Sequence, residues 1–156
     1  MTARVFLGVG SNLGDRQLHL ERAVRGLDAM FGVKLMARAS THETVAVLPP
    51  GDNTPQPNYL NTVVEIETTR AHDSLLSELK VLEGLIGRVP GPRWSARVID
   101  IDILLFGSDV VTVDGLSIPH PEMHRRRFVL EPLCEIAPDV LHPVLRLSAR
   151  ELLSRL

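Results

Sequence analysis

The sequence predicts an α+β fold, a ferredoxin-like sandwich in which helices pack on an antiparallel sheet. Two segments have apolar residues at helical spacing, and extended segments flank each of them. The order along the chain is therefore strand–helix–strand followed by strand–helix–strand, which is the order of this fold. Two helices on one face of such a sheet would leave the other face free for a site. At 156 residues, the chain is expected to form a single domain over 1–156.

The first strand–helix–strand unit begins near the amino terminus. Residues 4–9 are typical of a strand, and glycines interrupt the chain at 10–14. Asp15 is placed to cap the following helix, and Gly32 is placed to end it. The apolar residues of this helix recur at helical spacing: Leu20, Ala23, Val24, Leu27, Met30 and Phe31. Residues 33–47 are typical of an irregular strand.

The second unit follows a loop, because residues 48–58 contain four prolines. Residues 59–67 alternate as a strand, and residues 72–86 place leucines, Leu85 among them, along the apolar side of a helix. Glycines and prolines make 87–97 a loop, and a strand-forming run extends from Arg97 to Phe106. The remaining elements are expected to be short: a hairpin around 110–113, helical segments at 121–127 and 128–136, and a terminal helix at 148–156.

The strand at the end of the second unit carries two carboxylates, Asp100 and Asp102. Successive side chains of a strand point to opposite faces, so these two share one face. Ile99, Ile101 and Ile103 share the other face and are expected to fill a core. Two like charges repel, and Mg²⁺ would relieve the repulsion because it prefers carboxylates together with substrate phosphate oxygens. The alternative is a solvated pair on an exposed sheet edge, and the pair alone does not decide between them.

The loop before this strand contains Arg88, Arg93 and Arg97 and the only tryptophan, Trp94. Guanidinium groups suit phosphate oxygens because they are planar, permanently charged and bidentate. An arginine loop that leads into a carboxylate pair indicates a site for a polyphosphate held on Mg²⁺. For each arginine taken separately, solubility is the simpler explanation.

Composition excludes several classes of protein. The net charge of −2 argues against a nucleic-acid partner bound through a basic face. The single cysteine, Cys134, excludes an internal disulfide and is expected to be a small buried apolar residue. The sequence shows neither a signal peptide nor an apolar run of membrane-spanning length. We therefore expect a monomeric, cytoplasmic protein with no membrane segment.

Several short segments together resemble the 6-hydroxymethyl-7,8-dihydropterin pyrophosphokinases of folate biosynthesis. They occur in the family's order from residue 4 to about residue 140: Gly8–Arg16, Pro57–Asn61, Glu83 with Gly87 and Arg88, Arg93 with Trp94, Arg97–Leu104, Ile118–His120, Arg126 and Phe128. Each segment is weak alone, and the set is specific. The family has the ferredoxin-like fold that the order of elements predicts.

The resemblance implies transfer of the β,γ-pyrophosphoryl group of ATP to the hydroxymethyl oxygen of the pterin, giving AMP and the pterin diphosphate. It places two Mg²⁺ ions on Asp100 and Asp102, and it makes Arg88 and Arg97 the arginines that assist transfer. The positions that match the family's ATP-binding residues are Glu83, Arg93, Trp94, Ile103, His120 and Arg126. The positions that match its pterin-binding residues are Thr44, Tyr59, Asn61 and Phe128.

Alternatives remain for individual residues and for the whole chain. His120 could be a structural histidine after Pro119, and Tyr59 and Phe128 could be ordinary core aromatics. A non-catalytic ferredoxin-like binding module would leave the carboxylate pair without a role. A metal-dependent phosphohydrolase would need a base for water, and the sequence shows no histidine or carboxylate cluster beside the pair.

The chain also departs from the family pattern. Val45 stands where proline is usual, the 48–58 loop is longer than typical, Ser95 and Ala96 replace a usual Gly-Pro pair, and Lys80 replaces a frequent glutamine. Gly8 and Gly10 lack the further glycine or lysine of a nucleotide-binding loop, so they are expected to allow close approach of the pterin or a tight strand exit.

Overall fold

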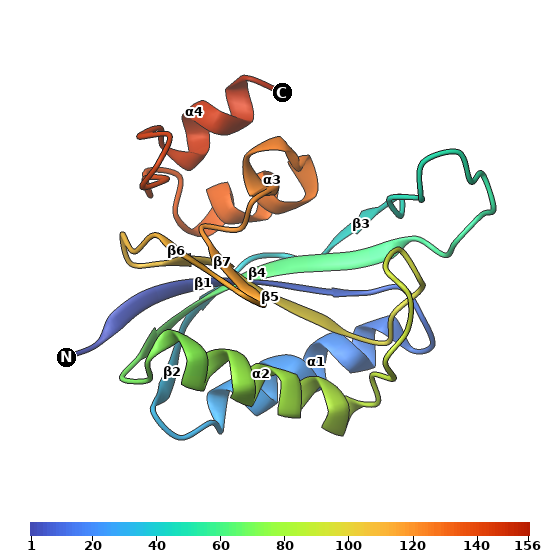
Figure 1. Cartoon of the computed structure of the whole chain (residues 1–156), viewed down its shortest axis with the longest axis horizontal. Coiled ribbons are helices and arrows are strands. Elements are labelled where there is room, and N and C mark those ends of the chain that lie inside the picture. The colour runs from blue at the N-terminus through green and yellow to red at the C-terminus, as the bar shows by residue number, and fades with distance from the viewer.

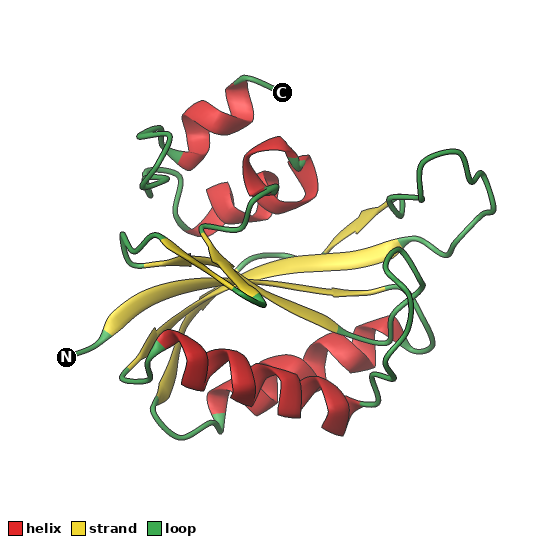
Figure 2. Ribbon diagram, in the orientation of Figure 1, coloured by secondary structure: helices red, strands yellow, loops and turns green.

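The computed structural model describes residues 1–156 and is built around one antiparallel sheet (Figures 1 and 2). Its five strands are β1 (Ala3–Ser11), β2 (Val33–Arg38), β3 (His42–Thr44), β4 (Tyr59–Thr68) and β5 (Asp100–Phe106). They are arranged in the order β2-β4-β1-β5, and β3 pairs with β4 beyond the end of β2. With one helix after β1 and another after β4, the predicted ferredoxin-like sandwich is confirmed.

Helices α1 (Arg16–Asp28) and α2 (His72–Ile86) cover one face of the sheet. Asp15 caps α1 as predicted, because its carboxylate accepts a hydrogen bond from the Leu18 amide at 3.1 Å. Their buried faces meet the sheet in a core that contains these side chains: Val5, Leu7, Val9, Leu20, Leu27, Val64, Ile66, Leu75, Leu79, Ile99, Ile101 and Ile103. Ile99, Ile101 and Ile103 therefore fill a core, as their alternation with the aspartates predicts.

Two apolar residues assigned to these helix faces lie outside the core. Helix α1 ends at Asp28, and Phe31 lies in the turn after it with 89% of its surface exposed. Gly32 occupies this turn at a φ of +78°, a conformation that glycine adopts without strain. Leu85 lies within α2 but is 80% exposed. The expectation that Phe31 and Leu85 pack inward was wrong.

The opposite face is not free, contrary to the expectation from the sequence. Helices α3 (Arg127–Ile136) and α4 (Ala149–Ser154), with the short 3-10 turn η1 (Met123–Arg125), cover part of it (Figure 1). They form a second core with the sheet: Phe6, Val63, Leu104, Leu105, Met123, Val129, Leu130, Leu133 and Leu152. Cys134 of α3 is half-buried at this layer, and burial raises the pKa of its thiol. Only the end of this face near Gly10 and Asp100 stays open.

Tertiary hydrogen bonds displace two predicted boundaries. The irregular strand predicted at 33–47 divides into β2 and β3, because the backbone of Ala39 bonds to Val63 and to the Thr62 hydroxyl between them. The strand expected from Arg97 begins at Asp100, because Asn12 binds both the amide and the carbonyl of Arg97.

A two-stranded hairpin, β6 (Val111–Val113) with β7 (Leu116–Ile118), follows β5 where the sequence predicts a hairpin. None of the helices is both long enough and apolar enough to cross a lipid bilayer.

Candidate active site

Two adjoining cavities of about 370 and 380 Å³ occupy the open end of the sheet. The first, which we call the pterin-side cavity, contains seven of the predicted site residues: Thr44, Tyr59, Asn61, Arg93, Trp94, Arg126 and Phe128. The second, the outer cavity, contains three: Glu83, Arg88 and Ile103. Four of the predicted site residues line both cavities: Arg97, Asp100, Asp102 and His120. The structure thus brings every predicted site residue to one region, and the carboxylate pair lies where the cavities meet.

The pterin-side cavity exists because β1 has no side chains there. In the sheet, Gly10 lies between Asn61 of β4 and Asp100 of β5, and Gly8 lies beside Asp102. A Cβ atom on Gly10 would lie 2.6 Å from Asn61 Oδ1, whereas one on Gly8 would meet nothing closer than 3.5 Å. Gly10 therefore leaves room for the Asn61 side chain and keeps the floor of the cavity open.

The two carboxylates have different electrostatic surroundings. Asp100 accepts from the guanidinium groups of Arg88 at 3.0 Å and Arg97 at 3.2 Å. Burial, together with the neighbouring Asp100 charge, raises the pKa of Asp102 to about 7. A cation between the two would stabilise the charged form of both. Two hard carboxylate oxygens fit a Mg²⁺ ion that takes its remaining ligands from water and substrate phosphate.

Glu83 of α2 lines the outer cavity and binds two of the elements around it. It is 5% exposed, and its Oε2 accepts from the Ile101 amide at 2.7 Å and from Arg88 at 2.9 Å. Burial raises the pKa of Glu83, and these two hydrogen bonds oppose that effect. The carboxylate thus holds α2, the arginine loop and β5 together, while its assignment to ATP binding stays a prediction. The side chain of Ile103 belongs to the core below the sheet and forms part of the cavity wall.

The predicted pterin residues come from three elements. Tyr59 and Asn61 lie on β4, Thr44 on β3 and Phe128 at the start of α3. Asn61 Nδ2 donates to Thr44 Oγ1 at 2.6 Å, and Thr44 is the register partner of Tyr59. Burial and the nearby Asp100 raise the pKa of Tyr59, so its phenol is neutral at physiological pH. The cavity thus offers aromatic surface and amide and hydroxyl groups, which suit a flat polar heterocycle.

The 48–58 loop and the arginine loop are tied together over the cavity by two residues that the sequence reasoning missed. Gln56 Nε2 donates to the Trp94 carbonyl at 2.5 Å. Asn12, fully buried, donates to the Pro57 carbonyl at 3.2 Å and accepts from the Arg97 amide at 2.7 Å. Asn12 belongs to a segment that carries the resemblance, and this is the only signal in the sequence that could have indicated it.

His120 lines both cavities together with the carboxylate pair, although it is distant from the pair in the sequence. Its backbone amide donates to the Leu104 carbonyl at 2.9 Å, and its Nδ1 accepts from the Glu122 amide at 3.1 Å. Burial and the nearby Arg126 lower the pKa of its imidazole. The neutral ring therefore carries its proton on Nε2, so this nitrogen is a donor and not a base for water.

Sequence comparison connects this site with characterised proteins. A family model described as 7,8-dihydro-6-hydroxymethylpterin-pyrophosphokinase (HPPK) matches residues 6–138. The chain is 41% identical over 138 residues to the 2-amino-4-hydroxy-6-hydroxymethyldihydropteridine pyrophosphokinase of Methylorubrum extorquens, with 88% of this chain and 85% of that protein aligned. It is 38% identical over 138 residues to the protein of the same name from Haemophilus influenzae, with 88% and 84% aligned.

Solved structures share the fold at low sequence identity. The crystal structure of wild-type Plasmodium falciparum HPPK-DHPS aligns with 98% of this chain at a TM-score of 0.75 and 19% identity. The chain spans 43% of that longer protein. This similarity concerns the fold of one part of the larger protein.

Proposed function

The chain belongs to the 7,8-dihydro-6-hydroxymethylpterin-pyrophosphokinase family, and we propose that it performs the family's reaction with Mg²⁺ held by Asp100 and Asp102. The resemblance that the sequence segments indicate is thereby confirmed. The enzyme transfers a pyrophosphoryl group from ATP to the hydroxymethyl group of 6-hydroxymethyl-7,8-dihydropterin, a step of folate biosynthesis.

One observation supports the proposed arrangement most strongly: the two cavities share the carboxylate pair. The acceptor and the donor must approach each other at the reacting phosphorus atom, since positioning supplies much of the rate in phosphoryl transfer. A pterin held by Tyr59, Asn61 and Phe128 would point its hydroxymethyl group towards Asp100 and Asp102. The triphosphate of ATP would extend across the same carboxylates from the outer cavity.

Asp100 and Asp102 would hold two Mg²⁺ ions on the triphosphate. The ions would offset the charge of the phosphates during transfer. The same ions would offset the burial and the Asp100 charge that together raise the pKa of Asp102. The two residues would therefore both be charged in the substrate complex.

Arg88 and Arg97 would assist the transfer as donors to phosphate oxygens. In the structure both guanidinium groups bind Asp100. Once Asp100 binds a cation, this partner is lost, and the phosphates offer the arginines a better one. Arg93 and Trp94 are packed together, with the guanidinium 4.7 Å from the ring centre, and would close over the nucleotide with Arg126 and His120.

Two alternative functions fit the site less well. A phosphohydrolase lacks a residue that it needs, and a binding module leaves residues of the site without a role. A phosphohydrolase needs a base beside the metal, and the hydrogen bond to His120 Nδ1 leaves a donor facing the cavities. A non-catalytic binding module would not need two arginines on one half-buried carboxylate. The pyrophosphokinase reaction uses all of these groups.

Product analysis tests the proposal. Incubation with ATP, Mg²⁺ and 6-hydroxymethyl-7,8-dihydropterin should give AMP and pterin diphosphate in equal amounts, and chelation of Mg²⁺ should stop the reaction. Formation of ADP, or release of AMP at the same rate without the pterin, would contradict it. Thermal-shift measurements with an ATP analogue, Mg²⁺ and pterin, singly and together, would separate a catalytic site from a simple binding module.

We also propose that residues 1–156 act as one pyrophosphokinase domain. Both cores pack against the same sheet, so neither helix layer has a separate structural framework. A monomer located in the cytoplasm fits the composition, and analytical ultracentrifugation of the purified protein would test the monomer.

A further inference from the structure

Strand β3 is the least supported part of the pterin-side cavity. It has three residues, His42–Thr44, and pairs only with β4. The long 48–58 loop begins four residues after it, and the partly exposed Glu43 of the strand pairs with Arg16 at 3.1 Å. Because so short an edge strand has few backbone hydrogen bonds, its position depends on contacts made by its side chains.

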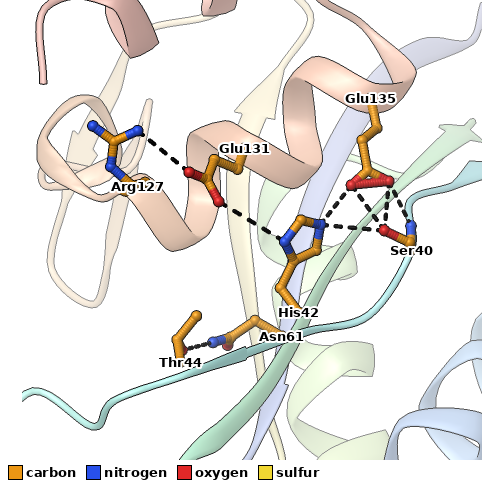
Figure 3. Close-up of polar contacts among 7 residues, drawn as sticks. All are labelled: Ser40, His42, Thr44, Asn61, Arg127, Glu131 and Glu135. Carbon is orange, nitrogen blue, oxygen red and sulfur yellow. Dashed lines mark hydrogen bonds and ion pairs between the residues drawn. The ribbon is translucent and has the colours of Figure 1, made fainter.

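A polar cluster joins β3 to α3 (Figure 3). Glu135 Oε1 accepts from the Ser40 amide and hydroxyl, each at 2.8 Å. Glu135 Oε2 lies 2.5 Å from His42 Nε2. One helical turn earlier, Glu131 lies 3.9 Å from His42 Nδ1 and is itself bonded to Arg127 at 3.3 Å. Helix α3 thus binds both the strand and the residues just before it.

This cluster lies next to the pterin residues without lining the cavity itself. His42 is the register partner of Asn61, and Thr44 follows two residues later on the same face of β3. Figure 3 shows the Asn61–Thr44 hydrogen bond beside the imidazole. On the other side, α3 begins one residue before Phe128. The cluster therefore connects the strand that carries Thr44 with the helix that carries Phe128.

We propose that Glu135, with Ser40 and His42, is a positioning residue for pterin binding. It holds β3 at the distance from α3 at which Thr44 and Asn61 stay bonded and face Phe128. This inference rests on the proposed function, because it assumes that these three residues bind the pterin. It predicts a specific loss of pterin affinity when Glu135 is removed, although Glu135 does not touch the ligand.

The test compares Glu135→Ala with the wild-type enzyme by calorimetry in Mg²⁺ and a non-hydrolysable ATP analogue. The Kd of the pterin should rise about tenfold, the loss expected when a charged hydrogen-bonding group is removed. The Kd of the ATP analogue should change less than about twofold, and kcat at saturating pterin should be retained. Glu135→Gln keeps an acceptor oxygen for Ser40 and should recover part of the affinity.

A double-mutant cycle with Thr44→Val tests the route of the effect. If Glu135 acts through β3, its removal should cost less once the Thr44 hydroxyl is gone, so the two losses should not add. Glu65→Ala is the matched control, because Glu65 pairs with Arg4 at 3.1 Å elsewhere on β4 and away from both cavities. It should leave both affinities unchanged.

Three results would overturn the inference: an unchanged pterin Kd in Glu135→Ala, equal losses for pterin and ATP analogue with a lower melting temperature, or additive losses with Thr44→Val. The second result would show that Glu135 only stabilises the fold. Failure of the wild-type enzyme to bind the pterin would instead refute the proposed function.

Discussion

The two faces of the central sheet are built from the same strands but have different roles: one packs against helices α1 and α2, and the other carries the candidate site. On the side of α1 and α2, β1 presents Val5, Leu7 and Val9, all of them buried. On the other side the same strand presents Phe6, Gly8 and Gly10, so it has no side chains at the two positions nearest the site. The first face gains stability from apolar burial. The second face has no apolar side chains to bury at Gly8 and Gly10. The cavity and the charged residues of the site lie there instead.

The largest expected effect is on the site face. Asp100→Ala or Asp102→Ala should lower kcat by two or more orders of magnitude, about 3 kcal/mol of transition-state stabilisation, because a metal ligand is lost. The melting temperature of Asp102→Ala should not fall, because this change removes the buried member of a repelling pair, whereas Asp100→Ala also loses the ion pairs with Arg88 and Arg97. AMP formation and thermal unfolding measured on the same samples check this. Near-normal activity in either variant would contradict the assignment of Asp100 and Asp102 as metal ligands. The site face would then not be specialised for catalysis.

The helix face should respond in the opposite way. Leu79→Ala removes a side chain that is 1% exposed and should reduce the free energy of unfolding by about 3 kcal/mol. The Kd of ATP analogue and pterin should stay the same in the fraction that remains folded. Leu85→Ala on the same helix is the control, because Leu85 is 80% exposed and should change stability by less than about 0.5 kcal/mol. Urea denaturation of both variants gives the comparison.

A single methyl group on the site face should separate binding from stability. Gly10→Ala places a Cβ 2.6 Å from Asn61 Oδ1 and 3.3 Å from the Tyr59 ring, so both side chains must move. We expect pterin affinity to fall about tenfold, as for a misplaced hydrogen-bonding group. Gly8→Ala meets nothing closer than 3.5 Å and should have the smaller effect. Equal pterin affinity in these two variants, measured by calorimetry, would show that Asn61 does not need the space.

The last expected effect is a dependence of stability on pH. The folded-state pKa of Asp102 is raised to about 7, so folding retains a proton that the unfolded chain releases at a lower pH. The stability of the unliganded protein should therefore fall as pH rises from about 4 to 7. Asp102→Asn lacks this titration and should gain on the wild type by about 3 kcal/mol between pH 5 and pH 8. The measurement is the free energy of unfolding of both proteins at pH 5 and pH 8. The same difference between wild type and variant at both pH values would contradict the raised pKa of Asp102.

Local patterns predicted the elements well where packing follows periodicity. The helix predicted at 72–86 has these bounds in the structure, and the strand predicted at 59–67 extends one residue further. The later start of β5 could not be predicted, because it depends on hydrogen bonds between Asn12 and Arg97, which are far apart in the sequence. The cover provided by α3 was missed for a related reason, since short helices do not reveal which sheet face they pack on.

The site was predicted in two unequal ways. Residue chemistry alone indicated the carboxylate pair and the arginine loop, since like charges and guanidinium groups are visible in the sequence. The resemblance supplied the remaining residues, and the structure brings them to the two cavities. His120 lies near Asp100, and Gln56 lies over the cavity, because of contacts between segments that are far apart in the sequence. No local sequence pattern indicates such contacts.

Strand β5 is the outermost strand of the sheet beyond β1, and such a strand offers unpaired backbone groups to any other extended chain. Two of these groups are already occupied: the Ile101 amide by the Glu83 carboxylate, and the Leu104 carbonyl by the His120 amide. Asp100 and Asp102 add charge along the same edge. The Glu83 carboxylate, which is proposed to bind ATP, thus also protects this edge from pairing between molecules, so its loss would favour aggregation as well as inactivity.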